Sequence, residues 1–208
     1  MRRAPLPALA LLAIAGCSGS LFKDTTPPPT LYMLSAARQS PSADPQAAAS
    51  AAPNLSVLLP RVRAGLDTDR IAALYPDRRL DYYADVRWSG PLDEVLQDLE
   101  VQEFHAHSGL RNVSADRSVF ASPYWLEIEV LAFQAEYSAP NTTPVVHVHL
   151  LARVGDSASR RVLGSYEPDV REAASDNRMS AIVDAYNRAA AKALAEIASG
   201  TVSTLGGR

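Results

Sequence analysis

Apolar and polar positions alternate along several short segments of the chain, and this pattern predicts a set of β-strands. A short apolar run between turn-forming residues is typical of a buried strand, and strict alternation is typical of a strand with one face in water. Segments 71–75 and 80–88 flank the turn-like tetrapeptide 76–79, so we expect a hairpin there. The other expected strands are 31–35, 55–59, 124–136, 145–154 and 161–167.

The segments 124–136 and 145–154 predict the longest strand pair. Their apolar faces coincide if residues whose numbers sum to 280 lie opposite each other, because side chains alternate between the faces of a strand. The apolar face then pairs Leu126 with Val154, Ile128 with Ala152, Val130 with Leu150 and Ala132 with Val148. The other face pairs Glu127 with Arg153, Leu131 with His149 and Phe133 with His147.

Two segments have helical periodicity instead. The first begins at Gly90-Pro91 with acidic residues in its first turn, and Gly109 is the expected stop. The second follows a cap at Ser175 or Asp176 and carries an apolar stripe from Met179 to Ile197. We therefore predict an α+β fold: a mainly antiparallel sheet with two principal helices packed on one face, forming a single domain on a lipid-anchored flexible tether.

The N-terminus has the charge and apolar order of an export signal. Arg2 and Arg3 precede an apolar run of about ten residues, which is too short to span a bilayer. The tetrapeptide 14–17 resembles the bacterial lipobox, which implies cleavage between Gly16 and Cys17 and a covalent diacylglycerol and N-acyl lipid on Cys17. Cys17 is the only cysteine, so no disulfide can form within the chain. An ordinary signal peptide with a nearby cysteine is the alternative.

The expected boundaries follow from these segments. Residues 1–16 form the signal peptide, 17–30 a lipidated proline-rich tether, and 31–199 the folded domain. Within that domain, 36–53 is expected to be a flexible insertion, because it is rich in alanine, serine and proline and has no apolar face. Residues 200–208 are expected to be a disordered tail.

Charge excludes one class of partner. The formal net charge is -3 and becomes -5 once Arg2 and Arg3 are removed with the signal. A nucleic-acid surface needs clustered basic residues that displace counterions. We therefore expect no nucleic-acid partner.

The candidate chemistry is sparse. Two histidine pairs, His105 with His107 and His147 with His149, could each supply two metal ligands. Zinc needs a third and usually a fourth ligand, and the expected register places Leu131 and Phe133 beside the second pair. We interpret these histidines as solvent-facing or partly packed and expect no metal, with a metal site as the alternative.

Motifs for catalysis are absent from the sequence: it contains no nucleophile elbow, Walker loop or dinucleotide fingerprint. We expect no catalytic residues and no cofactor apart from the lipid. Tyr82, Tyr83 and Trp88 form a candidate partner surface, since aromatic residues are favoured interface anchors. Packing in the core or at a sheet edge is the alternative for these three.

Several motifs together resemble a known family. They are the lipobox ending at Cys17, the strand 31–34 after a proline tract, the segment 55–60 leading into 65–67, the tyrosine-rich strand 80–88 running into Pro91-Leu92, the strand 125–133 and the closing helix 182–197. With them, residues 17–199 resemble the ABC-type transport auxiliary lipoprotein component family, which includes the paraquat-inducible protein C. The insertion 36–53 is longer than the resemblance leads us to expect.

The resemblance implies a non-catalytic lipoprotein of the outer membrane that faces the periplasm. Its partner would be the periplasmic MCE-domain protein of an ABC lipid transporter, whose lipid tunnel it would dock or cap, and a homo-oligomeric ring is a further implication. Two alternatives remain: a lipoprotein pilot or chaperone for another envelope assembly, and an envelope hydrolase with a metal at His147 and His149.

Overall fold

The computed structural model describes residues 27–35, 53–105, 110, 112–115 and 122–206. The predictions for the signal peptide, for lipidation at Cys17, for the tether up to residue 26, for the insertion from 36 to 52 and for His107 and Gly109 lie outside these residues.

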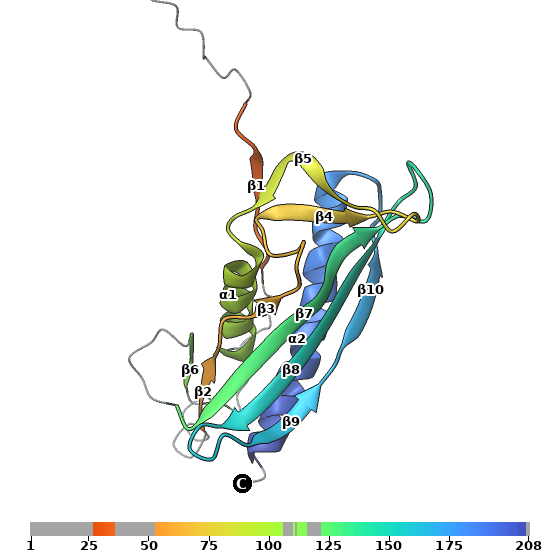
Figure 1. The fold of residues 1–208 in the computed structure, drawn as a ribbon. Helices are drawn as coiled ribbons and strands as arrows, with labels where there is room; N and C mark the ends of the chain where they lie inside the picture. The colour runs from red at the N-terminus through yellow and green to blue at the C-terminus, as the bar shows by residue number, and fades with distance from the viewer. Residues whose placement is uncertain (1–26, 36–52, 106–109, 111, 116–121, 207–208) are drawn as a thin grey trace, which may run out of the picture.

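A long strand, β7 (Tyr124–Glu136), organises the sheet. On one side it pairs antiparallel with β8 (Val145–Asp156). On its other side three strands run parallel to it in succession: β2 (Asn54–Val57), β3 (Arg61–Val62) and β4 (Arg70–Leu74). The chain thus follows one edge of β7 along its length before β7 itself is formed (Figure 1).

The remaining strands extend this arrangement. β5 (Leu80–Trp88) forms the predicted hairpin with β4, and β1 (Thr30–Tyr32) lies parallel to β5. β6 (Asn112–Ala115) lies parallel to β2. β9 (Val162–Tyr166) and β10 (Asp169–Ala173) both pair antiparallel with β8, at its two ends. Among the described residues these ten strands form one sheet.

The predicted α+β class is confirmed, and the sheet is more mixed than the sequence predicts. The most extensive pairs are antiparallel, but β1, β2, β3, β4 and β6 add short parallel pairs. The pattern of residues does not predict β3, β6 or β10. These strands have only two to five residues each, so an alternating pattern has little room to develop.

The predicted register of β7 and β8 is confirmed from Leu126 to Val130 and is wrong beyond it. A β-bulge after Val130 inserts one extra residue into β7, so Ala132 lies opposite His149 and Gln134 lies opposite His147. A bulge shifts every later pair by one position. Leu131 and Phe133 are therefore not the partners of the two histidines, and Phe133 faces the core instead, where it is 1% exposed.

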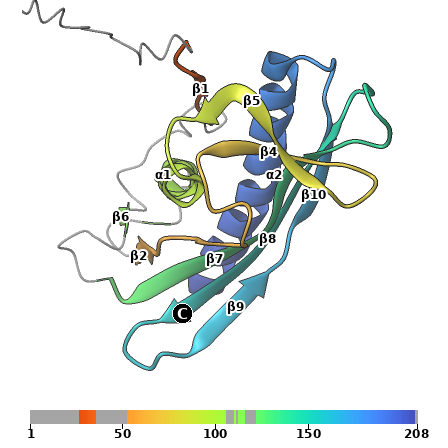
Figure 2. The ribbon, with the colours of Figure 1, turned by 45° about the horizontal axis from the view of Figure 1, so that its top comes forward.

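Both predicted helices are present, and they contribute to the same hydrophobic core. α1 (Leu92–His105) contacts α2, β2, β3 and β6, and α2 (Met179–Gly206) contacts β8, β9 and β10. Figure 2 shows α2 running diagonally behind the long strands, with α1 beside it. The predicted stripe on α2 is buried from Ile182 to Ile197.

The prediction of a disordered tail is wrong for residues 200–206, because α2 continues through Gly206. Thr201 is 0% exposed and Leu205 is 3% exposed. Ile197, Thr201 and Leu205 follow one another at intervals of four residues, so they continue the buried stripe along the same face of the helix. The predicted folded domain ends at residue 199, directly before Gly200. Gly200 is needed here because a Cβ on it would lie 2.3 Å from the Tyr166 ring.

The molecule is elongated, and its two ends differ. The chain enters the described part at Pro27 beside β1, at the upper end in Figure 1, whereas β7 begins and β8 finishes at the lower end. The long strands connect the two ends. A segment that precedes residue 27 therefore attaches far from the end of the molecule where β7 begins and β8 finishes.

Candidate functional site

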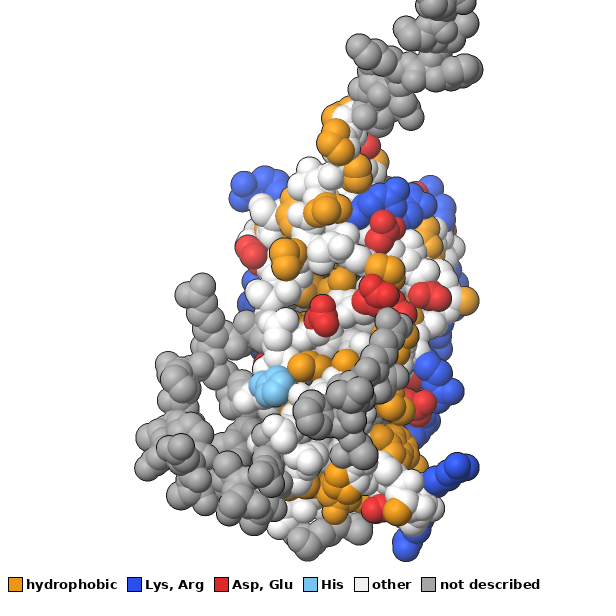
Figure 3. Space-filling model, turned by 90° about the vertical axis from the view of Figure 1, so that its left-hand side faces the viewer, with side chains coloured by type: hydrophobic (Ala, Val, Ile, Leu, Met, Phe, Trp, Pro, Cys, Tyr) orange, Lys and Arg blue, Asp and Glu red, His pale blue; other side chains and the backbone are white. Residues whose placement is uncertain are grey.

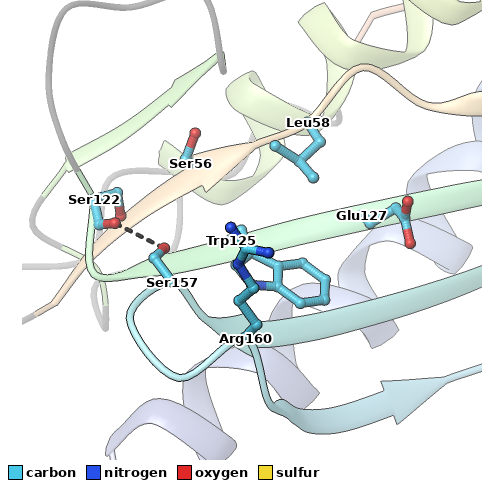
Figure 4. A pocket seen from close by; sticks show the side chains of 7 residues that line it. All are labelled: Ser56, Leu58, Ser122, Trp125, Glu127, Ser157 and Arg160. Carbon is cyan, nitrogen blue, oxygen red and sulfur yellow. Dashed lines mark hydrogen bonds between the residues drawn. The ribbon is translucent and has the colours of Figure 1, made fainter.

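A pocket of about 510 Å³ lies at the end of the sheet where β7 begins and β8 finishes. It is lined by Ser56, Leu58, Ser122, Trp125, Glu127, Ser157 and Arg160. Figure 4 shows these side chains on β2, on β7, on the segments next to these two strands and on the loop that follows β8. The site thus combines an aromatic ring, an aliphatic side chain and one charge of each sign.

Trp125 forms the apolar centre of the pocket, and a glycine makes room for it. Gly155 lies directly opposite Trp125 in the β7–β8 pair. A Cβ on Gly155 would lie 2.1 Å from the indole ring, closer than two carbon atoms can approach. The indole therefore lies flat over the backbone of β8 only because residue 155 lacks a side chain.

Backbone hydrogen bonds hold the loops around the pocket. The Ser157 hydroxyl donates to the Ser122 carbonyl at 2.9 Å (Figure 4), and the Ser157 N–H donates to the Pro123 carbonyl at 2.8 Å. The Ser122 hydroxyl in turn lies 2.6 Å from the Asn54 carbonyl oxygen. These contacts join β2, β7 and the loop after β8, so the pocket does not depend on a single loop.

The pocket is lined by one acidic and one basic side chain, Glu127 and Arg160. Glu127 forms an ion pair with Arg61 at 2.9 Å and lies 3.7 Å from the guanidinium of Arg153. Arg160 is exposed, lies in no ion pair among the described residues, and has a φ of 57°, a conformation that non-glycine residues adopt rarely. Arg160 is thus the cation through which the pocket can attract an anionic group.

The arrangement favours binding over catalysis. Ser122 and Ser157 use their hydroxyl groups on backbone carbonyls, and no histidine is among the lining residues. A nucleophilic serine needs a general base within hydrogen-bond distance. An aromatic ring beside a few polar groups is instead typical of a recognition site.

The sequence analysis did not identify this pocket. Its signal was present, because the register that sums to 280 places Gly155 opposite Trp125. A glycine across from a tryptophan on the solvent face of a strand pair indicates a ring that lies over the backbone. The contributions of Ser122 and Arg160 depend on loop geometry, which has no comparable pattern in the sequence.

Tyr82, Tyr83 and Trp88, the predicted partner surface, do not form one exposed surface in the structure. Trp88 is 2% exposed and packs in the core against Phe133 and Tyr186, with ring centroids 6.0 and 5.1 Å away. This corrects the expectation for Trp88. The tryptophan is buried because it is the last residue of β5, where α2 covers the sheet with Tyr186.

The two tyrosines of that surface are half-buried and hold neighbouring segments. Tyr82 donates to the Gly65 carbonyl at 2.7 Å, and Arg70 lies over its ring. The Tyr83 and Tyr137 hydroxyl groups are 2.8 Å apart, and burial and this hydrogen bond raise the pKa of Tyr83 far above its usual value. Both tyrosines thus stabilise the β4–β5 end of the sheet.

The histidines of β8 lie on the face of the sheet opposite the core. His147 contacts Glu136 and Asp169, and His149 contacts Glu167. Burial raises the pKa of Glu136, but hydrogen bonds from Arg171 and His147 outweigh this effect and bring it below its usual range. His105 is exposed at the end of α1 and has no such neighbours among the described residues.

The fold and the pocket define the class of protein: an α+β binding protein. The described residues that line its pocket do not form a catalytic site. The family model for the ABC-type transport auxiliary lipoprotein component matches residues 32–198. The chain therefore belongs to this family of auxiliary transport lipoproteins. The resemblance noted in the sequence is confirmed.

Solved structures share the fold. A Xanthomonas campestris protein of the family model DUF330 is 24% identical, with a TM-score of 0.71 over 84% of this chain and 96% of its own. A second crystal structure, of an uncharacterized protein, is 16% identical, with a TM-score of 0.61 over 83% of this chain and 98% of its own. The comparison with curated sequences gives no match.

Neither α1 nor α2 combines the length and the apolar character that a membrane-spanning helix needs.

Proposed function

We propose that the chain is a non-catalytic outer-membrane lipoprotein that docks or caps the periplasmic lipid tunnel of an MCE-type ABC transporter. Lipid on Cys17 would hold it at the membrane, and the folded body would bind the MCE-domain protein. The observation that carries this proposal is the family match over residues 32–198.

The separation of the two ends of the molecule supports this role. Residues before 27 join the body beside β1, and the Trp125 pocket lies at the opposite end of the long strands (Figure 1). The proline run 27–29 favours an extended chain, which would space the body from the lipid. A partner that approaches from across the periplasm would meet the pocket end first.

The surface chemistry also fits a protein partner. Figure 3 shows one face of the molecule, on which acidic side chains gather near the middle and basic ones near the margins. On that face the described residues do not form the continuous basic surface that a polyanion would need. At the pocket, Trp125 and Arg160 are residue types enriched among interface anchors.

Co-purification from detergent-solubilised envelopes tests the proposal. The lipidated wild-type chain should recover an MCE-domain protein, and a Cys17→Ser chain produced at the same level should lose it together with membrane association. A Trp125→Ala chain that keeps its anchor should recover less of the partner. The proposal fails if the wild-type chain recovers no MCE-domain protein and lipid trafficking is normal after deletion.

The oligomeric state belongs to the same proposal. A ring would bring several copies of the pocket to one tunnel, and many weak contacts would then combine. The mass of the purified lipoprotein in detergent, measured by light scattering, should exceed that of one chain. A mass that equals one chain would exclude a ring, and the protein would then dock as a single copy.

A further inference from the structure

A cluster of metal-binding side chains lies where β8 and β10 pair, away from the Trp125 pocket. His147 and His149 share one face of β8, and Asp169 is the direct partner of His149 on β10. One donor atom from each of these three residues lies within 4.8 Å of the other two. The bulge in β7 places Gln134, and not the apolar Phe133, opposite His147.

His147 is held between two carboxylates. Its Nδ1 lies 2.8 Å from Oε1 of Glu136, and its Nε2 lies 2.8 Å from Oδ1 of Asp169. A neutral imidazole carries one N–H and therefore donates to only one of these oxygens. The second contact requires a second proton on the ring, or a metal ion that replaces that proton once the two atoms move farther apart.

The contact with Glu136 is the kind that orients a metal-binding histidine. Ligating histidines usually donate their second ring N–H to a carboxylate, which fixes the tautomer and the plane of the ring. With its proton on Nδ1, His147 turns the lone pair of Nε2 toward Asp169. Arg171 donates to the other oxygen of the same carboxylate, Oε2 of Glu136, and so holds it from the other side. The Nη2 of Arg171 also lies 3.1 Å from Nδ1 and 3.5 Å from Nε2 of His147.

The charge of the cluster favours a divalent cation. Glu136, Asp169 and Glu167 bring three negative charges and Arg171 one positive charge, so with neutral histidines the net charge is -2. One divalent ion would neutralise it. Two imidazoles and a carboxylate are ligands that suit zinc.

We propose that His147, His149 and Asp169 form a zinc-binding site that links β8 to β10. Glu136 is a positioning residue for His147, and a fourth position is left for water. Zinc ligands at about 2.0–2.2 Å lie roughly 3.5 Å apart in a tetrahedron. Donor atoms that are up to 4.8 Å apart must therefore close in, and Nε2 of His147 and Oδ1 of Asp169, which are 2.8 Å apart, must separate slightly. His149 and Asp169 can supply this movement, because their side chains are 24% and 50% exposed.

Zinc titration of the full-length lipoprotein tests the site. The lipidated chain is purified in detergent without an affinity tag, washed with chelator and titrated with zinc chloride in a calorimeter. We expect one zinc ion per chain. His149→Ala and Asp169→Asn should each weaken binding by at least tenfold, whereas His105→Ala, which changes an exposed histidine on α1, should bind like the wild type.

Cobalt provides a second readout that a structural defect would not imitate. Cobalt bound with histidine in a tetrahedral site absorbs visible light, so a titration followed by absorption measures its affinity. Glu136→Gln should weaken cobalt binding by about 10–100-fold. Circular dichroism should show that this variant keeps its fold. The proposal is overturned if the wild-type chain binds no zinc. It is equally overturned if the folded His149→Ala and Asp169→Asn chains bind zinc as tightly as His105→Ala does.

Discussion

At the scale of single residues, Glu100 on α1 is unfavourably placed. It is 1% exposed, and its Oε2 has no hydrogen-bond partner among the described residues. Burial raises its pKa well above the usual value of 4.5, so the folded chain holds this proton to a higher pH than the unfolded chain does. As the pH rises above about 4.5, the unfolded chain releases this proton before the folded chain does. The free energy of unfolding therefore falls as the pH rises.

Glu100→Leu should therefore stabilise the protein at neutral pH. Removing a buried polar group that lacks a partner should gain about 1–3 kcal/mol in the free energy of unfolding. Denaturant unfolding at pH 7 and at pH 4 checks this, because the gain should be smaller at pH 4, where the unfolded chain also keeps its proton. A loss of stability at pH 7 would mean that the carboxylate has a favourable partner.

Gly155 tests the packing of Trp125. Gly155→Ala places a methyl group against the indole ring and should destabilise the protein by about 1–3 kcal/mol, the usual cost of overpacking. The same substitution in a Trp125→Ala chain should cost less than about 1 kcal/mol, because the ring that it meets is gone. Equal costs in the two backgrounds, measured by denaturant unfolding, would contradict the contact.

Residue patterns predict the site only in part. The apolar alternation of 126–130 fixes the register of β7 and β8 up to Val130. The bulge that follows has no signal in this pattern, because Leu131, Ala132 and Phe133 are all apolar and fit either register. The surroundings of His147 therefore could not be predicted, although both histidines are visible in the sequence.

At the scale of elements, Glu172 joins β10 to α2. It accepts hydrogen bonds from Lys192 and from Arg188, which lies 3.4 Å away, and the hydrogen bond from Lys192 lowers its pKa. The folded chain thus releases this proton at a lower pH than the unfolded chain does. This stabilisation is present above about pH 4.5 and is lost as the pH falls through the lowered value.

Glu172→Gln should reduce stability by about 1 kcal/mol at pH 7, since both cations are partly exposed and their attraction is screened. Thermal unfolding at pH 7 and at pH 3 measures the effect, and the difference between the two chains should be smaller at pH 3 than at pH 7. A difference that does not change with pH would exclude the ion pair as its cause.

The last turn of α2 provides another test. Leu205 is 3% exposed, so Leu205→Ala should destabilise the protein by about 2–3 kcal/mol through the cavity that it leaves. Ser203→Ala, at an exposed position of the same turn, is the matched control. If both substitutions have no effect on denaturant unfolding, residues 200–206 do not pack as described.

Helix and strand patterns predict the long elements well and the short ones poorly. The stripe on α2 is clear over five turns, and the hairpin of β4 and β5 follows from its turn and flanking strands. β3 and β10 form because they lie against β7 and β8, and their own residues carry too little pattern. Tertiary pairing, which a local pattern cannot contain, decides them.

At the scale of the whole molecule, the α+β class and the family follow from the sequence, and the orientation of the body does not. The order of elements predicts a sheet covered by two helices, which the structure confirms. Only the structure places β1 and the Trp125 pocket at opposite ends. This arrangement suits a protein that is held at one end and binds a partner at the other.

Site-specific photo-crosslinking in intact envelopes tests this account most directly. A benzophenone amino acid at Leu58, in the pocket, is compared with the same probe at Asp184, an exposed position on α2. We expect mass spectrometry to identify an MCE-domain protein crosslinked from position 58 and little or none from position 184. Crosslinks to that protein from 184 but not from 58, or from neither position, would contradict docking through the pocket end.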